Sequence, residues 1–151
     1  MKTAKLLLVE NNLLLARLLP LQLTKHGYEI VAVAKSGEEA IIKAAQHPLD
    51  LVLMDIDLDG MVDGIAAAAG IQAAQDVPVI FTTSHADAEI QRRVQAAGPV
   101  TCLLKPFTEK EISIAIEFNL YRHRAERERT RLEAELKRLN DQLRESAKGM
   151  S

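Results

Sequence analysis

The feature that most constrains the fold is a short apolar run at residues 49–55, which ends at Asp55. Five of its seven residues are apolar, and the next nine residues contain three aspartates and two glycines. A short apolar run bounded by turn-forming residues is typical of a strand buried on both faces of a parallel sheet. Chemistry in open α/β sheets gathers beyond the carboxyl ends of the strands, where Asp55 is expected to lie. The alternative at this point is that Asp55 only caps the following helix.

The rest of the chain alternates apolar runs of strand length with segments of helical periodicity. Strands are expected at residues 5–9, 28–34, 49–54, 77–82 and 101–104. Helices are expected at residues 13–26, 36–45, 65–74 and 87–97, and a last helix is expected to begin at Thr108. This alternation with short connections predicts an α/β fold, in which a five-stranded parallel sheet is covered by helices on both faces.

The first expected helix, at residues 13–26, is rich in leucine and has Asn12 as its candidate N-cap. Pro20 lies inside it and should kink the helix or remove one hydrogen bond. The helical period predicts which leucines form its buried face. They are Leu14, Leu18 and Leu21, with Leu15 and Leu19 as further candidates.

The last helical pattern runs without Gly or Pro to residue 148, well beyond the roughly 8–20 residues of a globular helix. Leucines recur in it at spacings of 4, 3 and 4: Leu132, Leu136, Leu139 and Leu143. This spacing predicts a short coiled-coil seam, flanked by i,i+4 pairs such as Arg131 with Glu135. We therefore expect a homodimer through this helix. The alternative is a single helix exposed to solvent.

Composition limits the class of protein. The chain has 151 residues, of which 48% are hydrophobic and 26% charged, as in a soluble globular domain. No apolar run approaches the roughly 20 residues of a membrane helix, and no signal-peptide pattern occurs. The one cysteine, Cys102, fits the reducing cytoplasm.

The charge is distributed unevenly along the chain. Residues 1–121 contain 10 Lys/Arg and 15 Asp/Glu (net −5), and residues 122–151 contain 9 Lys/Arg and 6 Asp/Glu (net +3). Acids interleave the bases, so no nucleic-acid or membrane binding is expected.

Polar side chains follow four of the expected strands. They are Glu10 and Asn11 after the first, Asp55 after the third, Thr83 and Ser84 after the fourth, and Lys105 after the fifth. Parallel strands bring these ends to the same edge of the sheet. Carboxylate oxygens suit a hard divalent cation, whereas a hydroxyl and a lysine suit phosphoryl oxygens. The set therefore predicts a site at which Asp55 accepts a phosphoryl group.

These residues stand in segments that resemble the receiver domain of two-component response regulators, over residues 4–121. The matching segments are Leu-Leu-Val-Glu-Asn (7–11), Asp-Leu-Val-Leu-Met-Asp-Ile (50–56), Met-Val-Asp-Gly-Ile (61–65), Pro-Val-Ile-Phe-Thr-Thr-Ser (78–84) and Leu-Leu-Lys-Pro-Phe (103–107). The resemblance implies a flavodoxin-like sheet of strand order 2-1-3-4-5. It also implies a receiver domain at residues 1–121, which leaves residues 122–151 as a helical, coiled-coil extension.

The resemblance implies a role for each strand-end residue. Asp55 is the phospho-acceptor, Thr83 the switch hydroxyl, and Lys105 the phosphate-contacting lysine, with a cis peptide bond to Pro106. The implied Mg²⁺ ligands are Glu10, Asn11, Asp55 and the backbone carbonyl of Asp57. The implied donor is a histidine kinase or a phosphotransfer protein. Such a domain is a cytoplasmic signalling module, not an enzyme, beyond catalysing its own phosphorylation and dephosphorylation.

Three positions depart from the family pattern. Asn11 replaces an aspartate that binds Mg²⁺, so the metal should be held more weakly. Cys102 replaces an aromatic residue that turns inward when the switch hydroxyl engages phosphate, and Asp59 replaces a common proline. These departures leave open a phosphorylation-independent pseudo-receiver that acts as an interaction or dimerisation module, including as an N-terminal fragment of a multidomain sensor kinase. A self-assembling coil capped by the receiver is a third interpretation.

Overall fold

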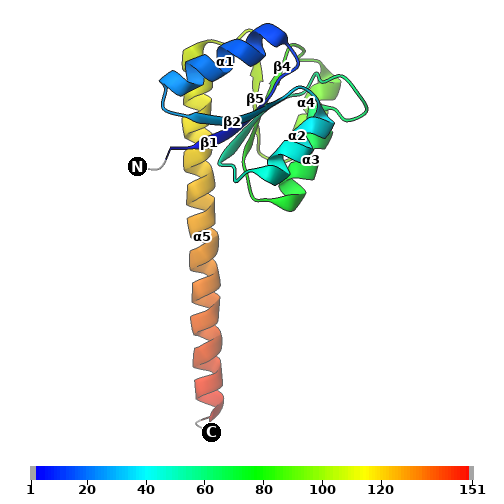
Figure 1. The fold of residues 1–151 in the computed structure, drawn as a ribbon. Helices are drawn as coiled ribbons and strands as arrows, with labels where there is room; N and C mark the ends of the chain where they lie inside the picture. The colour runs from blue at the N-terminus through cyan, green and yellow to red at the C-terminus, as the bar shows by residue number, and fades with distance from the viewer. Residues whose placement is uncertain (1–2, 150–151) are drawn as a thin grey trace. The chain divides into compact units, whose positions relative to one another are not determined.

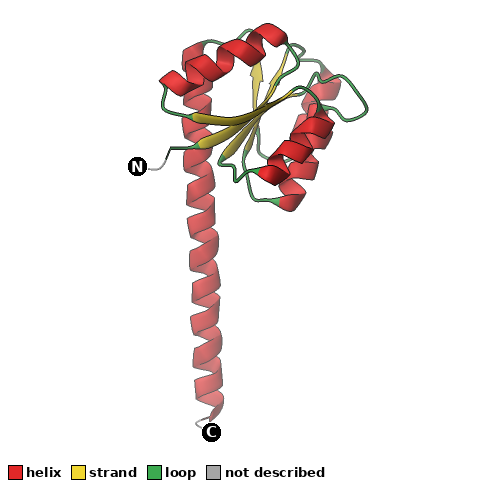
Figure 2. Ribbon diagram, in the orientation of Figure 1, coloured by secondary structure: helices red, strands yellow, loops and turns green. Residues whose placement is uncertain are grey.

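The five strands form one parallel sheet in the order β2-β1-β3-β4-β5, as predicted. The structure is a computed structural model that describes residues 3–149. The strands are β1 (Lys5–Val9), β2 (Glu29–Ala34), β3 (Leu51–Asp55), β4 (Val79–Thr83) and β5 (Thr101–Leu104). The helices are α1 (Leu13–Lys25), α2 (Gly37–Gln46), α3 (Gly64–Ala74), α4 (Ala88–Ala96) and α5 (Glu109–Gly149). Strands and helices alternate, so the sheet lies between two layers of helices (Figure 2).

Helices α2, α3 and α4 cover one face of the sheet, and α1 and the first turns of α5 cover the other (Figure 1). Successive strand residues point to opposite faces. In β3, Val52 and Met54 join the core under α2–α4, whereas Leu51 and Leu53 join the core under α1 and α5. All five residues of β3 are buried. This double coverage explains why the strand carries no polar side chain before Asp55.

The start of α3 lies directly against the end of β3. A Cβ added to Gly64 would lie only 2.1 Å from the carbonyl oxygen of Asp55, so only glycine fits there. Asp63 is the N-cap of α3, and its Oδ1 accepts a hydrogen bond from the backbone N–H of Ala66 at 2.9 Å. The cap is therefore supplied by Asp63, and the interpretation of Asp55 as a helix cap is wrong.

The predicted buried face of α1 is wrong for its three main residues and right for the two further candidates, Leu15 and Leu19, which pack on the core. Leu14, Leu18 and Leu21 are exposed by 73%, 42% and 68%, whereas Leu19 and Leu23 are exposed by only 3% and 0%. The helix has leucines on nearly every side, so periodicity alone could not decide which stripe faces the sheet. The capping prediction for this helix is confirmed, since the Oδ1 of Asn12 accepts from the N–H groups of the second and third residues. Pro20 lies inside the helix, and the kink expected from it stays a prediction. The leucine stripe on its outer face remains in solvent.

Two strands end one residue later than predicted, and both shifts bear on the site. The structure places the end of β3 at Asp55 and the end of β4 at Thr83. Pro78 stands just before β4 and supplies only its carbonyl oxygen to the sheet, because proline has no N–H to donate. Asp55 and Thr83 are therefore the last residues of their strands and do not belong to the loops that follow.

The chain divides into two compact units, Met1–Leu120 and Tyr121–Ser151. In the second unit, residues 121–149 belong to α5 and their side chains are largely exposed. The four leucines of the predicted seam are exposed by 44–69%. Over residues 3–149, no helix combines the length and the apolar composition of a membrane span.

The charged flanks of this helix confirm the predicted i,i+4 pairing in part, because Arg129 lies 3.6 Å from Glu133. Arg131 pairs with Glu128 at 2.6 Å, and Arg138 pairs with Glu135 at 2.5 Å, both at i,i+3 spacing. Arg131 therefore forms its close ion pair with Glu128 and not with the predicted Glu135, although the Glu135 carboxylate still helps to raise the pKa of Arg131. In the two i,i+3 pairs the arginine reaches the carboxylate that precedes it, because a helical side chain points toward the N-terminus of its helix.

Candidate functional site

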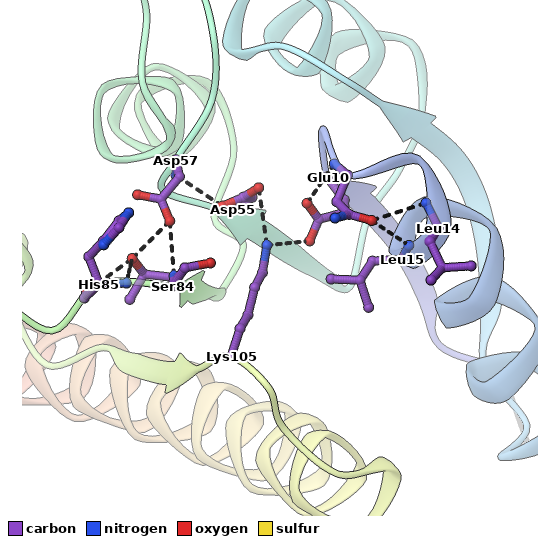
Figure 3. Close-up of polar contacts among 10 residues, drawn as sticks. Glu10, Leu14, Leu15, Asp55, Asp57, Ser84, His85 and Lys105 are labelled. Atoms are coloured by element: carbon purple, nitrogen blue, oxygen red, sulfur yellow. Dashed lines mark hydrogen bonds and ion pairs between the residues drawn. The ribbon is translucent and has the colours of Figure 1, made fainter.

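Three strand ends place ionisable side chains at one edge of the sheet (Figure 3). Glu10 follows β1, Asp55 ends β3, and Lys105 follows β5. Both carboxylates are buried, with an exposed fraction of 1% each. Parallel strands end at the same edge, so these groups meet although they are distant in the sequence. The structure thus brings together three of the residues predicted for the site.

Lys105 is the cation of this edge. Its Nζ lies 2.6 Å from Oε1 of Glu10 and 3.3 Å from Oδ2 of Asp55. The Lys105 N–H donates to the carbonyl oxygen of Thr83 at 2.8 Å, and the peptide bond to Pro106 is cis, as the resemblance implied. One ammonium group therefore serves two buried carboxylates.

The edge is short of positive charge. Burial raises the pKa of Glu10 above its ordinary value, and the neighbouring Asp55 carboxylate raises it further. Lys105 and the backbone N–H of Asn12, which donates to Oε2 of Glu10 at 3.0 Å, act in the opposite direction. Two buried carboxylates with one cation attract further positive charge.

The two carboxylate oxygens of Asp55 are in different environments. Oδ1 accepts a hydrogen bond from the backbone N–H of Asp57 at 2.9 Å. Oδ2 is buried and has no hydrogen-bond partner among the described residues, so its contact with Lys105 is an ion pair without a hydrogen bond. A buried oxygen without a donor is costly unless the site uses it. Oδ2 is therefore the atom available to a cation or to an electrophilic phosphorus.

Thr83 is close to this site, but its hydroxyl is bonded to Asp57 and not to Asp55. The hydroxyl lies 3.1 Å from Oδ2 of Asp57, and the backbone N–H of Ser84 donates to the same oxygen at 2.9 Å. The N–H and the carbonyl oxygen of His85 also lie 3.1 Å from the Thr83 hydroxyl. The sequence predicts a role only for the backbone carbonyl of Asp57 and gives no indication of this side-chain contact. The sequence around an acidic residue in a loop does not indicate which hydroxyl group its side chain will contact.

The oxygen donors of this edge fit a hard cation, with a reduced charge. Asn11 is half-buried next to Glu10 and offers a neutral amide. Within residues 3–149, no three acidic, His or Cys side chains are arranged to hold a metal ion. The unbonded Oδ2 of Asp55 and the raised pKa of Glu10 nevertheless mark an edge that a divalent cation would neutralise.

Cys102, in β5, lines a groove of about 440 Å³ between α4 and the end of the sheet. Thr83 and His85 contribute to one side of it, and Ile90 and Leu104 also line it. Partial burial, together with the negative charge of Asp57, raises the pKa of the Cys102 thiol. The groove is therefore continuous with the residues that hold the Asp57 carboxylate.

The sheet order and the acid–lysine edge define a class of signalling domain. The family model of the response regulator receiver domain matches residues 6–117. This match spans β1 through the part of α5 that packs on the sheet. The chain belongs to the response regulator receiver family.

Several known proteins are similar to this chain. The transcriptional regulatory protein PdtaR of Mycobacterium tuberculosis is 34% identical over 151 residues, which cover 97% of this chain and 72% of PdtaR. The signal receiver domain of a modulated diguanylate cyclase from Desulfovibrio desulfuricans G20 is 34% identical with a TM-score of 0.78, covering 83% of this chain and 99% of that one. The receiver domain of a sensor histidine kinase from Pseudomonas aeruginosa PAO1, which has a magnesium ion in its active-site cleft, is 27% identical with a TM-score of 0.70, covering 79% and 98%. The names of these relatives describe a transcriptional regulator, a diguanylate cyclase and a sensor histidine kinase, so the similarity defines the receiver and not its output.

Proposed function

We propose that the protein receives a phosphoryl group on Asp55 from a histidine kinase or a phosphotransfer protein. The observation that carries this proposal is Oδ2 of Asp55, which is buried, has no hydrogen bond among the described residues and lies 3.3 Å from the Lys105 ammonium. Oδ2 attacks the phosphorus of a phosphohistidine, and an O–P bond forms as the P–N bond breaks. The imidazole nitrogen leaves with the electron pair of that bond and takes up a proton.

Lys105 would stabilise both the transfer and its product. A phosphoryl group brings a charge of about −2 at neutral pH and several acceptor oxygens. The ammonium that now contacts Glu10 at 2.6 Å is already within 3.3 Å of the attacking oxygen, so a small movement brings it to the phosphoryl oxygens. A fixed positive charge at the place where negative charge develops lowers the barrier to transfer.

Mg²⁺ is the cofactor that the donor set fits. Glu10, Asn11, Asp55 and the backbone carbonyl of Asp57 would hold it, and it would neutralise charge on the transferring phosphoryl group. The buried oxygens at this edge supply hard ligands, and Asn11 supplies an oxygen without charge. We therefore propose a functional but weak magnesium site.

The outer face of α1 is our proposed docking surface for the phosphoryl donor. Leu14, Leu18 and Leu21 are spaced by 4 and 3 residues and lie exposed on one side of the helix. The helix begins three residues after Glu10, at the same edge as the site, and Figure 3 shows Leu14 next to this edge. An apolar stripe with this spacing suits a helix of the donor, which would bring its histidine toward Asp55.

We further propose that residues 1–121 act as the receiver domain and residues 122–151 as an extension that joins two copies of the chain. The leucines of the seam, Leu132 to Leu143, keep the 4-3-4 spacing of a coiled coil and are exposed by 44–69%. Arginine–glutamate pairs flank them. An exposed apolar seam of about two heptads is buried most simply by the same seam of a second copy.

The test is phosphorylation by acetyl phosphate with Mg²⁺, followed by intact mass measurement. We expect the wild-type protein to gain the mass of one phosphoryl group, and Asp55→Asn or omission of Mg²⁺ to abolish the gain. If the wild type gains nothing, Asn11→Asp restores a carboxylate to the metal site and should restore labelling. Absence of labelling in both proteins would reject Asp55 as a phospho-acceptor.

The second candidate is a phosphorylation-independent interaction module. It is favoured by the absence, over the described residues 3–149, of three side chains arranged to hold a metal, and by the substitutions Asn11 and Cys102. In that case Asp55→Asn would leave the binding of partner proteins unchanged. Under our first proposal, the same substitution removes the response to phosphodonor.

A further inference from the structure

Two hydrogen-bond donors beside Asp55, the Thr83 hydroxyl and the Ser84 N–H, already bind a carboxylate of the protein itself. The Thr83 hydroxyl and the Ser84 backbone N–H converge on Oδ2 of Asp57, at 3.1 and 2.9 Å. Figure 3 shows the Asp57 carboxylate turned toward these two donors and away from Lys105. Convergence of a hydroxyl and an amide N–H on one oxygen is the arrangement expected for binding an anionic oxygen.

The backbone of Asp57 is tied to the phospho-acceptor at the same time. Its N–H donates to Oδ1 of Asp55 at 2.9 Å. One residue therefore links the carboxylate that would be phosphorylated with the hydroxyl of β4. The main-chain N–H of Asp57 contacts the Asp55 carboxylate, and its side chain contacts the Thr83 hydroxyl.

From these contacts we propose that the Asp57 carboxylate is an internal competitor of the phosphoryl group. It occupies the Thr83 and Ser84 donors in the resting protein and must leave them when Asp55 is phosphorylated. The inference rests on the proposed function, because it requires Asp55 to receive the phosphoryl group. It adds a regulatory residue that holds the unphosphorylated conformation.

The two anions cannot occupy the same donors. A phosphoryl group on Asp55 carries about two negative charges. It would lie beside the main chain of Asp57, whose N–H is 2.9 Å from an Asp55 oxygen. Like charges that converge on one pair of donors, the Thr83 hydroxyl and the Ser84 N–H, disfavour each other. The donors that Asp57 releases are then available to phosphoryl oxygens, so the two states use the same donors for different anions.

The exchange also reaches the groove lined by Cys102. The Thr83 hydroxyl lies 3.1 Å from both the N–H and the carbonyl oxygen of His85, and both residues line this groove of about 440 Å³. Movement of the hydroxyl toward Asp55 disturbs the two His85 contacts. Cys102 is a small residue that leaves the groove open, so the change reaches the surface through the segment 83–85 and requires no aromatic rotation.

The experiment compares Asp57→Asn and Asp57→Ala with wild type, using beryllofluoride at saturating Mg²⁺ as the phosphoryl mimic. Asparagine keeps an acceptor oxygen without the charge, and alanine removes both. Neither substitution removes the backbone carbonyl expected to face the metal. Affinity is measured by titration, and the resting state is followed through the backbone amide NMR signals of Ser84 and His85. Asp59→Asn is the matched control, because it removes the same charge from an exposed position of the same loop.

We expect beryllofluoride to bind Asp57→Ala about tenfold or more tightly than wild type, which corresponds to the loss of a charged hydrogen-bond partner. Asp57→Asn should lie between the two, and Asp59→Asn should match wild type. Without beryllofluoride, the Ser84 and His85 signals of Asp57→Ala should shift toward their positions in the wild-type complex.

Equal affinities for wild type and both Asp57 variants would overturn the inference and leave the proposed function intact. An equal gain in affinity in Asp59→Asn would also overturn it, because the effect would then be general loop charge. Failure of all four proteins to bind beryllofluoride would reject the proposed function and the inference together. A urea unfolding curve for each variant establishes that the comparison is made between folded proteins.

Discussion

Lys105 forms its closer ion pair with Glu10, at 2.6 Å, and not with the proposed phospho-acceptor. Its distance to the Asp55 oxygen is 3.3 Å, without a hydrogen bond. Glu10 thus keeps the ammonium beside Asp55 and leaves Oδ2 of Asp55 without a hydrogen bond. In the phosphoryl transfer that we propose, this arrangement would combine electrostatic support with a free nucleophile.

Replacement of Lys105 by alanine should destabilise the protein at pH 7 by on the order of 3 kcal/mol, because two buried carboxylates lose the cation that contacts them both. Urea unfolding measures this free energy, and the loss should shrink at pH 4.5 as Glu10, whose pKa is raised, takes up a proton. Lys110→Ala is the matched control, since Lys110 is exposed on α5. An equal loss in the two variants would show that the Glu10–Lys105 pair does not contribute to the free energy of unfolding.

Glu10→Gln should change how stability depends on pH. The pKa of Glu10 is raised in the folded protein above its ordinary value of 4.5, mainly by burial. The folded state therefore binds more protons than the unfolded state between these two pKa values, and this contribution to stability is lost as pH rises through the folded pKa. Relative to wild type, the variant should gain stability as pH is raised from about 4.5 to 7.5.

Urea unfolding at several pH values between these limits measures the effect. Glu38→Gln, a change at an exposed position, provides the control and should show no such trend. A constant difference between Glu10→Gln and wild type at all pH values would contradict the prediction.

The two faces of α1 should respond differently to truncation. Leu23→Ala removes a side chain that is 0% exposed and should cost about 3 kcal/mol of unfolding free energy. Leu21→Ala removes one that is 68% exposed and should cost less than about 0.5 kcal/mol. Chemical denaturation compares the two variants directly. Similar losses would mean that the inner face of this helix is misassigned.

The outer face of α1 should matter for the donor and not for the chemistry. We expect Leu14→Ser to slow phosphoryl transfer from a phosphorylated histidine phosphotransfer domain about tenfold, as the loss of a buried interface anchor does. Labelling by acetyl phosphate should stay at the wild-type rate. Leu132→Ser makes the same change in the second unit and should affect neither rate. Equal slowing with both donors would place the defect at Asp55 and not at a docking surface.

The seam of the second unit should control oligomeric state. Leu136→Asp places a charge in the middle of the leucine seam and should convert a dimer to a monomer, measured by light scattering after size-exclusion chromatography. Ala134→Asp places the same charge on the opposite side of the helix and should leave the dimer intact. A wild-type protein that is monomeric at all concentrations would exclude the proposed coil.

Much of the fold can be predicted from local sequence patterns. The run that ends at Asp55 has the length and composition of a doubly covered strand, and β3 is buried along its whole length. Helix starts were also predictable, since Asn12 and Thr108 make the capping contacts expected from their side chains. Both signals depend on neighbours within a few residues, which the sequence states directly.

The placement of polar groups at one edge was also predictable, because parallel strands end together. Glu10, Asp55 and Lys105 meet as their positions after the strands require. The hydrogen-bond partners of each side chain at this edge could not be predicted, because they depend on which atoms approach within hydrogen-bond distance in the folded protein. The turn of the Asp57 side chain toward Thr83 joins segments 26 residues apart, and no local pattern encodes it.

The sequence alone determined the alternation of strands and helices, the helix caps and the set of residues at the carboxyl edge, because periodicity, capping chemistry and chain direction are local properties. The strand order followed only from the resemblance to the receiver family. The tertiary structure decided which leucines of α1 are buried, which oxygen of Asp55 is free and which donors hold Asp57. Each of these depends on the distance between segments that only the packed sheet and helices bring together.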